Sequence, residues 1–269
     1  MPDIITITDD NYRGFIDSAD DMPGDHKGLT PRDFATFPVG HYANAGPIDF
    51  PLFSDEQIEK EIRNQEENGS SLEHLRMTYD GGKPIDALDQ NGQGYCWAYS
   101  TTSCVTLARA KQGMPYEPLS GHMIGCIIKN YRNQGGWNAQ SMQFAQEHGV
   151  ASQKFWPAKS MSRSNDTPEM REDARKRRIT EWWDLSDDPE TVKRQLATLL
   201  LLNCPVAVDF NWWLHSVCAI RLMSWRPFKI RILNSWSNSW SKLGMGDLEG
   251  GRAIPNGAIA PRVITAKAA

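Results

Sequence analysis

Apolar residues recur at regular spacing along the chain only after about residue 54. Residues 1–55 are rich in Asp, Gly and Pro and carry no sustained helical or alternating pattern. This composition predicts an extended arm that is mobile unless something holds it in place. The first helical pattern covers residues 54–68, where Ser54 can cap the helix and Gly69 can end it.

Helical spacing dominates residues 90–157. We predict helices over about residues 96–112, 120–132 and 139–148. Glycines follow the first and third of these segments as stop signals. The next segment, residues 158–179, is charged with both signs mixed, which predicts a solvated loop or an exposed helix rather than a binding patch.

The period changes after residue 179. Short apolar or alternating runs predict strands in ITEWWDL, CPVAVDF, HSVCAIRLM, FKIRILNSW and GMGDLEG. A last helical pattern covers residues 188–202, with Asp187 or Asp188 near its cap. Helices in one half and strands in the other predict an α+β protein with a helical lobe over about 90–157 and a β lobe over about 180–255.

Composition and charge exclude several classes of function. The 269-residue chain has a net charge of -4, which does not indicate nucleic acid as a partner. No apolar run is long enough for a membrane span, and MPDIITITDD lacks the features of a secretory signal. The five cysteines are scattered without a CxxC pair, which favours reduced thiols in the cytoplasm over a disulfide framework or a zinc site. Nothing indicates a metal or an organic cofactor.

Candidate chemistry begins at QNGQGYCWAY, residues 90–99. Cys96 follows a glycine-rich turn and starts a predicted helix. A helix N-terminus carries partial positive charge and free N–H groups, which lower the pKa of a thiol and favour the nucleophilic thiolate. The sequence therefore makes Cys96 a candidate nucleophile, provided that the chain supplies a base and a group that orients the base.

Of the six histidines, two lie in the arm, three lie near the ends of predicted helices, and His215 opens a predicted strand. A histidine in a strand is more often structural than catalytic, so position alone leaves its role open. Asn234 offers a side-chain oxygen that could accept from one imidazole nitrogen. Trp236, two residues further along the same predicted strand, could keep water away from that hydrogen bond.

These motifs stand in a fixed order, and residues 84–255 together resemble the papain family of cysteine peptidases. The matching residues are Gln90 with Cys96-Trp97-Ala98, Leu119-Ser120, Gly135-Gly136, His215, and Asn234-Ser235-Trp236 with Trp240. The resemblance implies a two-lobed fold, with a helical lobe and an antiparallel β-barrel-like lobe. It divides the chain into an N-terminal extension over 1–80 and a catalytic domain over 81–269.

The resemblance also implies a role for each matching residue. Cys96 would be the nucleophile, His215 the general base and acid, and Asn234 the group that orients His215. Gln90 and the backbone N–H of Cys96 would form the oxyanion hole. The implied activity is hydrolysis of peptide bonds in a peptide or protein substrate.

Four further residues would contact the substrate or protect the site. Gly135 and Gly136 would present their backbone to an extended peptide, which pairs with it like an added strand. Trp137 would lie at the edge of the pocket for the residue two before the scissile bond. Trp236 would shield the hydrogen bond between asparagine and histidine.

The chain departs from the family pattern at several positions. Gln93 and Asn133 stand where secreted members carry half-cystines, which fits a reducing compartment. Ser237 and Ser241 replace glycines, and each would cost on the order of 1 kcal/mol if its φ is positive. The Glu/Arg/Phe/Asn pattern of family propeptides is absent from residues 1–80.

Three functions remain open from the sequence. The first is an active thiol endopeptidase. The second is a structural or assembly component, for example of a virus particle, that uses a papain-like fold with latent or no activity and would reside in the virion. The third keeps the same residues but transfers the acyl group as an amidase, a deamidase or a transglutaminase-like enzyme. The arm, residues 1–55, would be held by its own catalytic domain, by a protein partner or by a large assembly.

Overall fold

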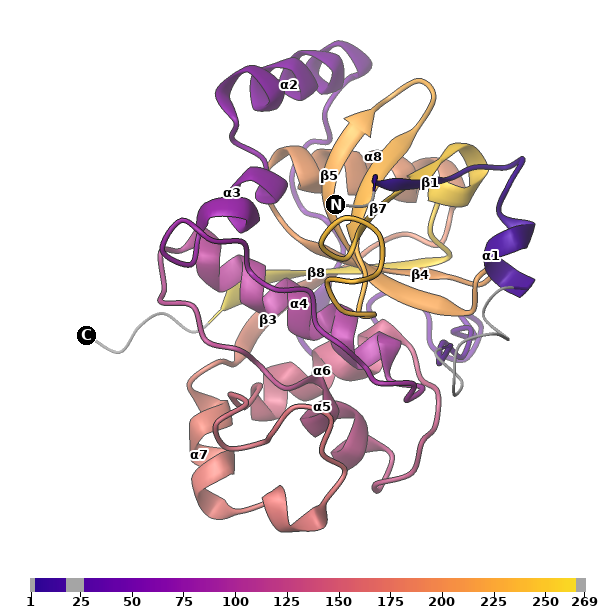
Figure 1. The fold of residues 1–269 in the computed structure, drawn as a ribbon. Helices are drawn as coiled ribbons and strands as arrows, with labels where there is room; N and C mark the ends of the chain where they lie inside the picture. The colour runs from indigo at the N-terminus through magenta and orange to yellow at the C-terminus, as the bar shows by residue number, and fades with distance from the viewer. Residues whose placement is uncertain (1–2, 18–26, 265–269) are drawn as a thin grey trace.

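The structure, a computed structural model, describes residues 3–17 and 27–264 (Figure 1). One of the two arm histidines, His26, lies outside the described residues. Helices dominate the first half of the domain that follows the arm and strands dominate the second half, so the predicted α+β class is confirmed. No helix in the described part of the chain has both the length and the apolar character needed to cross a lipid bilayer.

A single mixed sheet runs through the upper and middle parts of the molecule in Figure 1. Its strand order is β1-β7-β6-β5-β4-β8-β3-β2, and the six strands from β7 to β3 pair antiparallel. These six strands are β3 (Ile179–Asp184), β4 (Val206–Phe210), β5 (His215–Ser224), β6 (Lys229–Leu233), β7 (Met245–Glu249) and β8 (Gly257–Ile264). The two outermost strands, β1 (Ile5–Ile7) and β2 (Ala45–Gly46), come from the arm and pair parallel with their neighbours.

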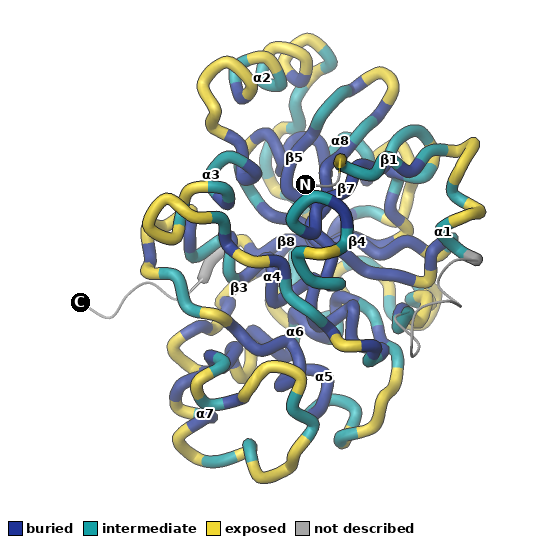
Figure 2. Tube along the Cα trace, viewed as in Figure 1, coloured by how far each residue is buried: buried dark blue, intermediate teal, exposed yellow. Residues whose placement is uncertain are grey.

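Several helices pack on this sheet. The helices are α1 (Arg13–Asp17), α2 (Asp55–Asn68), α3 (Leu72–Thr78), α4 (Cys96–Lys111), α5 (Gly121–Ile128), α6 (Asn138–His148), α7 (Pro168–Arg175) and α8 (Pro189–Leu201), with 3-10 turns η2 (Arg163–Asn165) and η3 (Gly250–Ala253). Of these, α5 and α7 lie further out, against α4 and α6. The buried helix α4 lies between the sheet and the lower helices, where it packs against β5 on one side and against α5 and α6 on the other (Figures 1 and 2).

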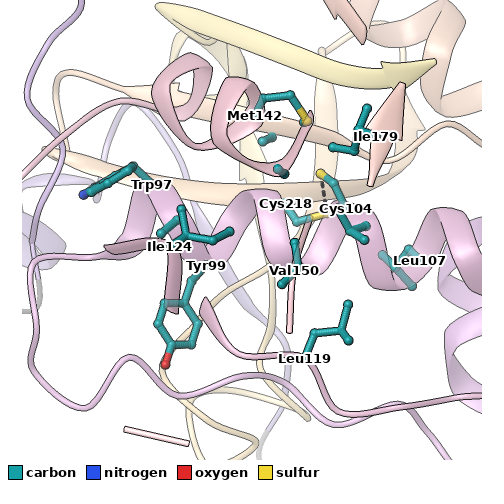
Figure 3. Close-up of a cluster of buried hydrophobic side chains, with 14 of the residues drawn as sticks. Trp97, Tyr99, Cys104, Leu107, Leu119, Ile124, Met142, Val150, Ile179 and Cys218 are labelled. Carbon is teal, nitrogen blue, oxygen red and sulfur yellow. Dashed lines mark hydrogen bonds between the residues drawn. The ribbon is translucent and has the colours of Figure 1, made fainter. Parts of the chain in front are cut away.

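Strand alternation divides the apolar side chains between two cores. In β4, Ala207 joins the core that lies between the sheet and the lower helices, whereas Val206 and Val208 join the core beneath α8. Figure 3 shows part of the first core, where the sulfurs of Cys104 on α4 and Cys218 on β5 lie 3.5 Å apart. This core joins the helical lobe to the sheet.

Several predicted helices are confirmed, and their ends follow from local chemistry. Ser54 and Gln57 form a capping box at the start of α2, and Gly69 ends this helix in the left-handed conformation. The prediction that a helix continues to residue 132 was wrong. The helix α5 ends at Ile128, and Asn130 and Tyr131 adopt positive φ values of 50° and 62°, which a continuing helix does not allow.

The prediction that Asn234 and Trp236 lie along a strand was also wrong, because β6 ends at Leu233. Asn234 nevertheless stays fixed, since its backbone N–H donates to the carbonyl of Gly244 at 2.8 Å. Trp236 forms an isolated bridge with Asp89 instead of continuing β6. The two residues therefore belong to a loop that is anchored at Gly244, just before β7, and at Asp89, ahead of α4.

Candidate active site

Cys96 is the first residue of α4 and is completely buried. Burial raises the pKa of its thiol to about 12, although the backbone N–H groups of Ser216, Trp97 and Gly28 act in the opposite direction. The sequence predicted a lowered pKa from the helix N-terminus, and this was wrong for the form described here. The reason is that desolvation of the thiolate outweighs the helix and the N–H groups.

His215 opens β5 and is held by Asn234, as the sequence predicts. Its Nε2 lies 2.7 Å from the Asn234 Oδ1, and both side chains are buried. The same oxygen accepts the backbone N–H of Ser235 at 2.7 Å, so Asn234 is the acceptor and the proton sits on Nε2 of His215. In the neutral imidazole, Nδ1 then carries the lone pair.

Aromatic rings enclose this hydrogen bond. Trp236 stacks on the imidazole with ring centroids 4.6 Å apart, and Trp213 meets it edge-on at 4.9 Å. Trp240 packs against Trp236 at 5.7 Å. The rings exclude water from the imidazole, which strengthens its hydrogen bond to Asn234.

Gln90 is joined to the same loop. Its Oε1 accepts from the hydroxyl of Ser235 at 2.6 Å, and its Nε2 donates to the carbonyl of Gln93 at 2.7 Å. Its backbone N–H donates to the Ser235 carbonyl at 2.9 Å. Ser235 therefore couples Gln90 to Asn234. The sequence showed Ser235 only as a member of a motif, because its side-chain partner is 145 positions away.

The helix and the strand meet beside the nucleophile. Ser216 directly follows His215, and its backbone N–H acts on the sulfur of Cys96. One turn further along α4, the Ser100 hydroxyl lies 2.8 Å from the Ser216 hydroxyl. The start of α4, which carries Cys96, and the start of β5, which carries His215, are thus fixed to each other through Ser216.

The arm crosses this site. The backbone N–H groups of Gly28 and Leu29 donate to the carbonyl of Leu214 at 3.3 and 3.1 Å. The Gly136 N–H donates to the carbonyl of Gly28, and the Thr30 N–H donates to the carbonyl of Gly136, both at 2.9 Å. Gly136, predicted to pair with an extended peptide, is therefore paired in parallel with the chain's own arm.

Glycine allows the arm to approach this closely. A β-carbon on Gly28 would lie 2.2 Å from the carbonyl carbon and oxygen of Gly94, two residues before the nucleophile. A β-carbon on Gly135 would lie 2.7 Å from the carbonyl oxygen of Gly28. Any side chain at Gly28 would consequently force the arm away from the cysteine.

The arm also covers Trp137 and is anchored beside it. The Trp137 Nε1 donates to the hydroxyl of Tyr42 at 2.9 Å, and the Phe37 ring lies 5.3 Å from the indole. Arg32 forms two hydrogen bonds with Asp184 on β3, at 2.8 and 2.9 Å, and the side chains of this ion pair are 3% and 0% exposed. The predicted edge of a substrate pocket is thus occupied from within the chain.

A model of the papain family of cysteine proteases matches residues 80–219, which is more than half of the chain. The chain belongs to the papain family. None of the curated proteins matches it in sequence. The papain-family region contains Gln90, Cys96 and His215, whereas the arm lies outside it.

Solved structures show the same fold. The procathepsin L2 proteinase from the larval midgut of Tenebrio molitor has a TM-score of 0.64 at 17% identity, over 91% of this chain and 81% of the other. Xylellain, a cysteine protease from Xylella fastidiosa, has a TM-score of 0.59 at 15% identity, over 89% of this chain and 96% of the other. A digestive procathepsin L 3 of Tenebrio molitor has a TM-score of 0.54 at 19% identity, over 80% and 83%.

The two serines that stand where the family resemblance implies glycines both have positive φ. Ser237 and Ser241 adopt φ values of 67° and 53°. Leu214, directly before the histidine, adopts 50°. The carbonyl of Leu214 accepts the two N–H groups of the arm, so this unusual backbone conformation lies where the arm is bound.

Proposed function

We propose that this papain-family chain is a cysteine endopeptidase that its own arm keeps latent. The observation that carries the proposal is the buried hydrogen bond from His215 to Asn234, because it sets the tautomer that a thiol needs from its base. The position of Cys96 at the start of α4, next to the N–H of Ser216, supports the pairing of sulfur and imidazole.

In the proposed mechanism, Nδ1 of His215 takes the proton of Cys96 and the thiolate attacks the carbonyl carbon of a peptide bond. Gln90 and the backbone N–H of Cys96 donate to the oxyanion, and each such donor is typically worth about 3 kcal/mol. The imidazolium then protonates the leaving amine. Water, deprotonated by His215, hydrolyses the thioester and releases the acid.

The arm supports latency rather than absence of activity. It covers Cys96 and occupies Gly136, which are the two places that a substrate needs. Its contacts with the carbonyl of Leu214, with Gly136 and with Asp184 are made to the same chain. The alternative of a structural component, held by a partner or in a virus particle, is distinguished from the peptidase by the reactivity of Cys96 once the arm is displaced. Acyl transfer to an amine would use the same residues, so the chemical identity of the products must distinguish it from hydrolysis.

The test opens the site by changing the arm. In Gly28→Val, the side chain collides with Gly94, so the arm leaves and the sulfur becomes accessible. We expect iodoacetamide to label Cys96 in this variant but not in the unmodified chain, and we expect Gly28→Val to hydrolyse a mixed peptide library. Adding His215→Ala should slow the labelling near pH 6 by at least about tenfold, since the thiolate loses its counterion.

Gly14→Ala is the matched control, because no atom lies within 4 Å of where its β-carbon would be. It should behave like the unmodified chain. An unreactive Cys96 in a folded Gly28→Val protein would support the structural alternative and reject the peptidase. Peptide products linked to an added amine, rather than carrying one added water, would instead indicate acyl transfer.

A further inference from the structure

A carboxylate that the proposed mechanism does not use lies behind the nucleophile. Asp209 on β4 is 3% exposed and stands in register with Ser216 on β5 and Gly257 on β8. Its negative charge adds to burial in raising the pKa of the Cys96 thiol. Asp209 therefore lies close to the site where a peptide bond would be cleaved.

The hydrogen bonding of Asp209 is incomplete. Its Oδ2 accepts the backbone N–H of Asn138 at 3.2 Å, whereas its Oδ1 accepts no hydrogen bond from any residue that the structure describes. Burial raises the pKa of this carboxyl to about 7, against the opposing effects of the Ser216 hydroxyl, the Asn138 N–H and the charge of Arg32. A buried carboxylate in this state gains most from a cation that donates a hydrogen bond to it.

The space beside this carboxylate is filled by the arm. A β-carbon on Gly257 would lie 3.6 Å from the Asp209 Oδ2 and 3.9 Å from the ring of Phe34. Phe34 belongs to the arm, and the guanidinium of Arg32 lies 4.5 Å from the centre of its ring. The arm therefore closes the space over Gly257 and brings one cation towards the carboxylate, although that cation is bound to Asp184.

We propose that Asp209 selects a lysine or arginine side chain on the peptide residue that pairs with Gly136. Asn138, whose N–H holds Asp209, is only two positions from Gly136, so a long basic side chain can reach the carboxylate. The proposal rests on the proposed function in one respect, that a peptide takes the place of the arm. The Oδ1 then gains a charge-assisted hydrogen bond, which is typically worth a factor of at least about 10 in affinity.

Binding tests this inference without catalysis. The full chain carrying Gly28→Val and Cys96→Ala is titrated with two peptides that differ only in arginine or leucine at the position that pairs with Gly136. We expect the arginine peptide to bind at least about tenfold more tightly. Adding Asp209→Asn should remove this preference, whereas Asp187→Asn, an equal change of charge at an exposed residue, should leave it unchanged.

A second variant tests the inference independently in case Asp209→Asn does not fold. Gly257→Val leaves the carboxylate in place but fills the space beside it. It should weaken binding of the arginine peptide while the leucine peptide changes by less than about threefold. Equal binding of the two peptides before any change at Asp209, or a preference that survives Asp209→Asn in a folded protein, would overturn the inference.

Hydrolysis separates this inference from the proposed function. In Gly28→Val with Cys96 intact, cleavage of both peptides at equal rates would retain the peptidase and reject the role of Asp209. Selective binding of the arginine peptide without cleavage would retain the role of Asp209 and reject the peptidase.

Discussion

Ser237 and Ser241 share a left-handed backbone but differ in what their side chains do. The Ser241 hydroxyl accepts the backbone N–H of Ile5 at 2.9 Å and so holds β1 of the arm. The Ser237 hydroxyl bonds locally to Ser239, with the Ser239 hydroxyl 2.7 Å away and the Ser239 backbone N–H donating to it at 3.2 Å. Position 241 therefore carries a side chain that contributes a contact to the arm.

These contacts predict opposite results for two identical substitutions. Ser237→Gly should leave the free energy of unfolding unchanged or raise it by up to about 1 kcal/mol, because the left-handed strain disappears. Ser241→Gly relieves the same strain but leaves the N–H of Ile5 without its acceptor, which costs about 2 kcal/mol, so the free energy of unfolding should fall by about 1 kcal/mol. Urea unfolding measures both values. Hydrogen exchange at Ile5 should accelerate only in Ser241→Gly, and equal exchange in both variants would contradict the role of Ser241.

Asp209 predicts a dependence of stability on pH. Its folded pKa is raised from 3.8 to about 7, so the folded state binds the proton more tightly than the unfolded state. The stabilisation is complete below pH 3.8 and is lost as pH rises through 7. The whole change is worth about 4 kcal/mol, at about 1.4 kcal/mol for each pKa unit.

The measurement is the difference in the free energy of unfolding between the unmodified chain and Asp209→Asn, from pH 4 to 8. The difference is needed because His122 acts oppositely in the same range. Burial lowers the pKa of His122 to about 4, so the stability that this histidine contributes is lost as pH falls. A difference that stays constant with pH would show that Asp209 titrates normally in the folded chain.

At the scale of elements, the buried pair of Arg32 and Asp184 anchors the arm. Arg32 also donates to the carbonyls of Phe37 and Pro38, at 2.8 and 2.7 Å. Arg32→Ala should therefore increase the population with an open arm by at least about 100-fold, which corresponds to the roughly 3 kcal/mol lost when one partner of a buried pair is removed. The labelling rate of Cys96 by iodoacetamide reports this population.

The control for the arm is Arg175→Ala. Arg175 also pairs with a carboxylate, that of Glu172 at 2.9 Å, but both side chains are at least 60% exposed. An exposed pair contributes about 0–1 kcal/mol, so labelling should not change. If Arg32→Ala labels no faster than this control, the arm is held by its backbone contacts instead.

Elements with local signals could be predicted from the sequence, and those that depend on distant partners could not. The helix α2 has its capping box and its terminal glycine within one segment, so its start and its end were both found. The strand β2 has two residues and exists only because Ala45 and Gly46 pair with β3. The strand β8 was missed because its sequence, GAIAPRVI, has no alternation of apolar and polar residues and contains a proline, so its strand structure depends on pairing with β4 and β3 on either side.

The candidate site also combines residues that the sequence could predict with a feature that it could not. Cys96, His215 and Asn234 stand in recognisable motifs, so their residue types predicted their chemistry. The path of the arm could not be predicted, because Gly28 and Leu29 belong to no motif and their partners are more than 100 positions away. The effect of the arm on Cys96 could not be predicted either, because the backbone N–H of Gly28 reaches the sulfur and acts to lower the pKa of the thiol, against the larger effect of burial.

At the scale of the molecule, the segment from β1 to α3 contacts the rest of the chain at several places. β1 adds to one edge of the sheet, β2 adds to the other edge, and the segment between them crosses the cysteine. Since the arm supplies both outer strands, its removal would expose the edges of β7 and β3. Opening the site by Gly28→Val therefore tests the middle of the arm while both edge strands can stay paired.

The helix α3, at the end of this segment, is held to the sheet by buried ion pairs. Glu73 on α3 pairs with Arg221 on β5, at 2.9 Å, and with Arg231 on β6. Arg231 in turn pairs with Asp247 on β7 at 2.7 Å. These side chains are at most 12% exposed, so the network joins α3 to three adjacent strands with little help from water.

Removing the shared carboxylate should destabilise the whole molecule, because Glu73→Gln leaves two buried guanidinium groups with one acceptor charge fewer. We expect the free energy of unfolding to fall by about 3 kcal/mol. Glu172→Gln breaks an exposed pair and should change it by less than about 0.5 kcal/mol. Urea unfolding of both variants distinguishes two arrangements. A loss confined to Glu73→Gln means that α3 and the sheet unfold together, whereas equal values would mean that α3 detaches from the sheet without cost.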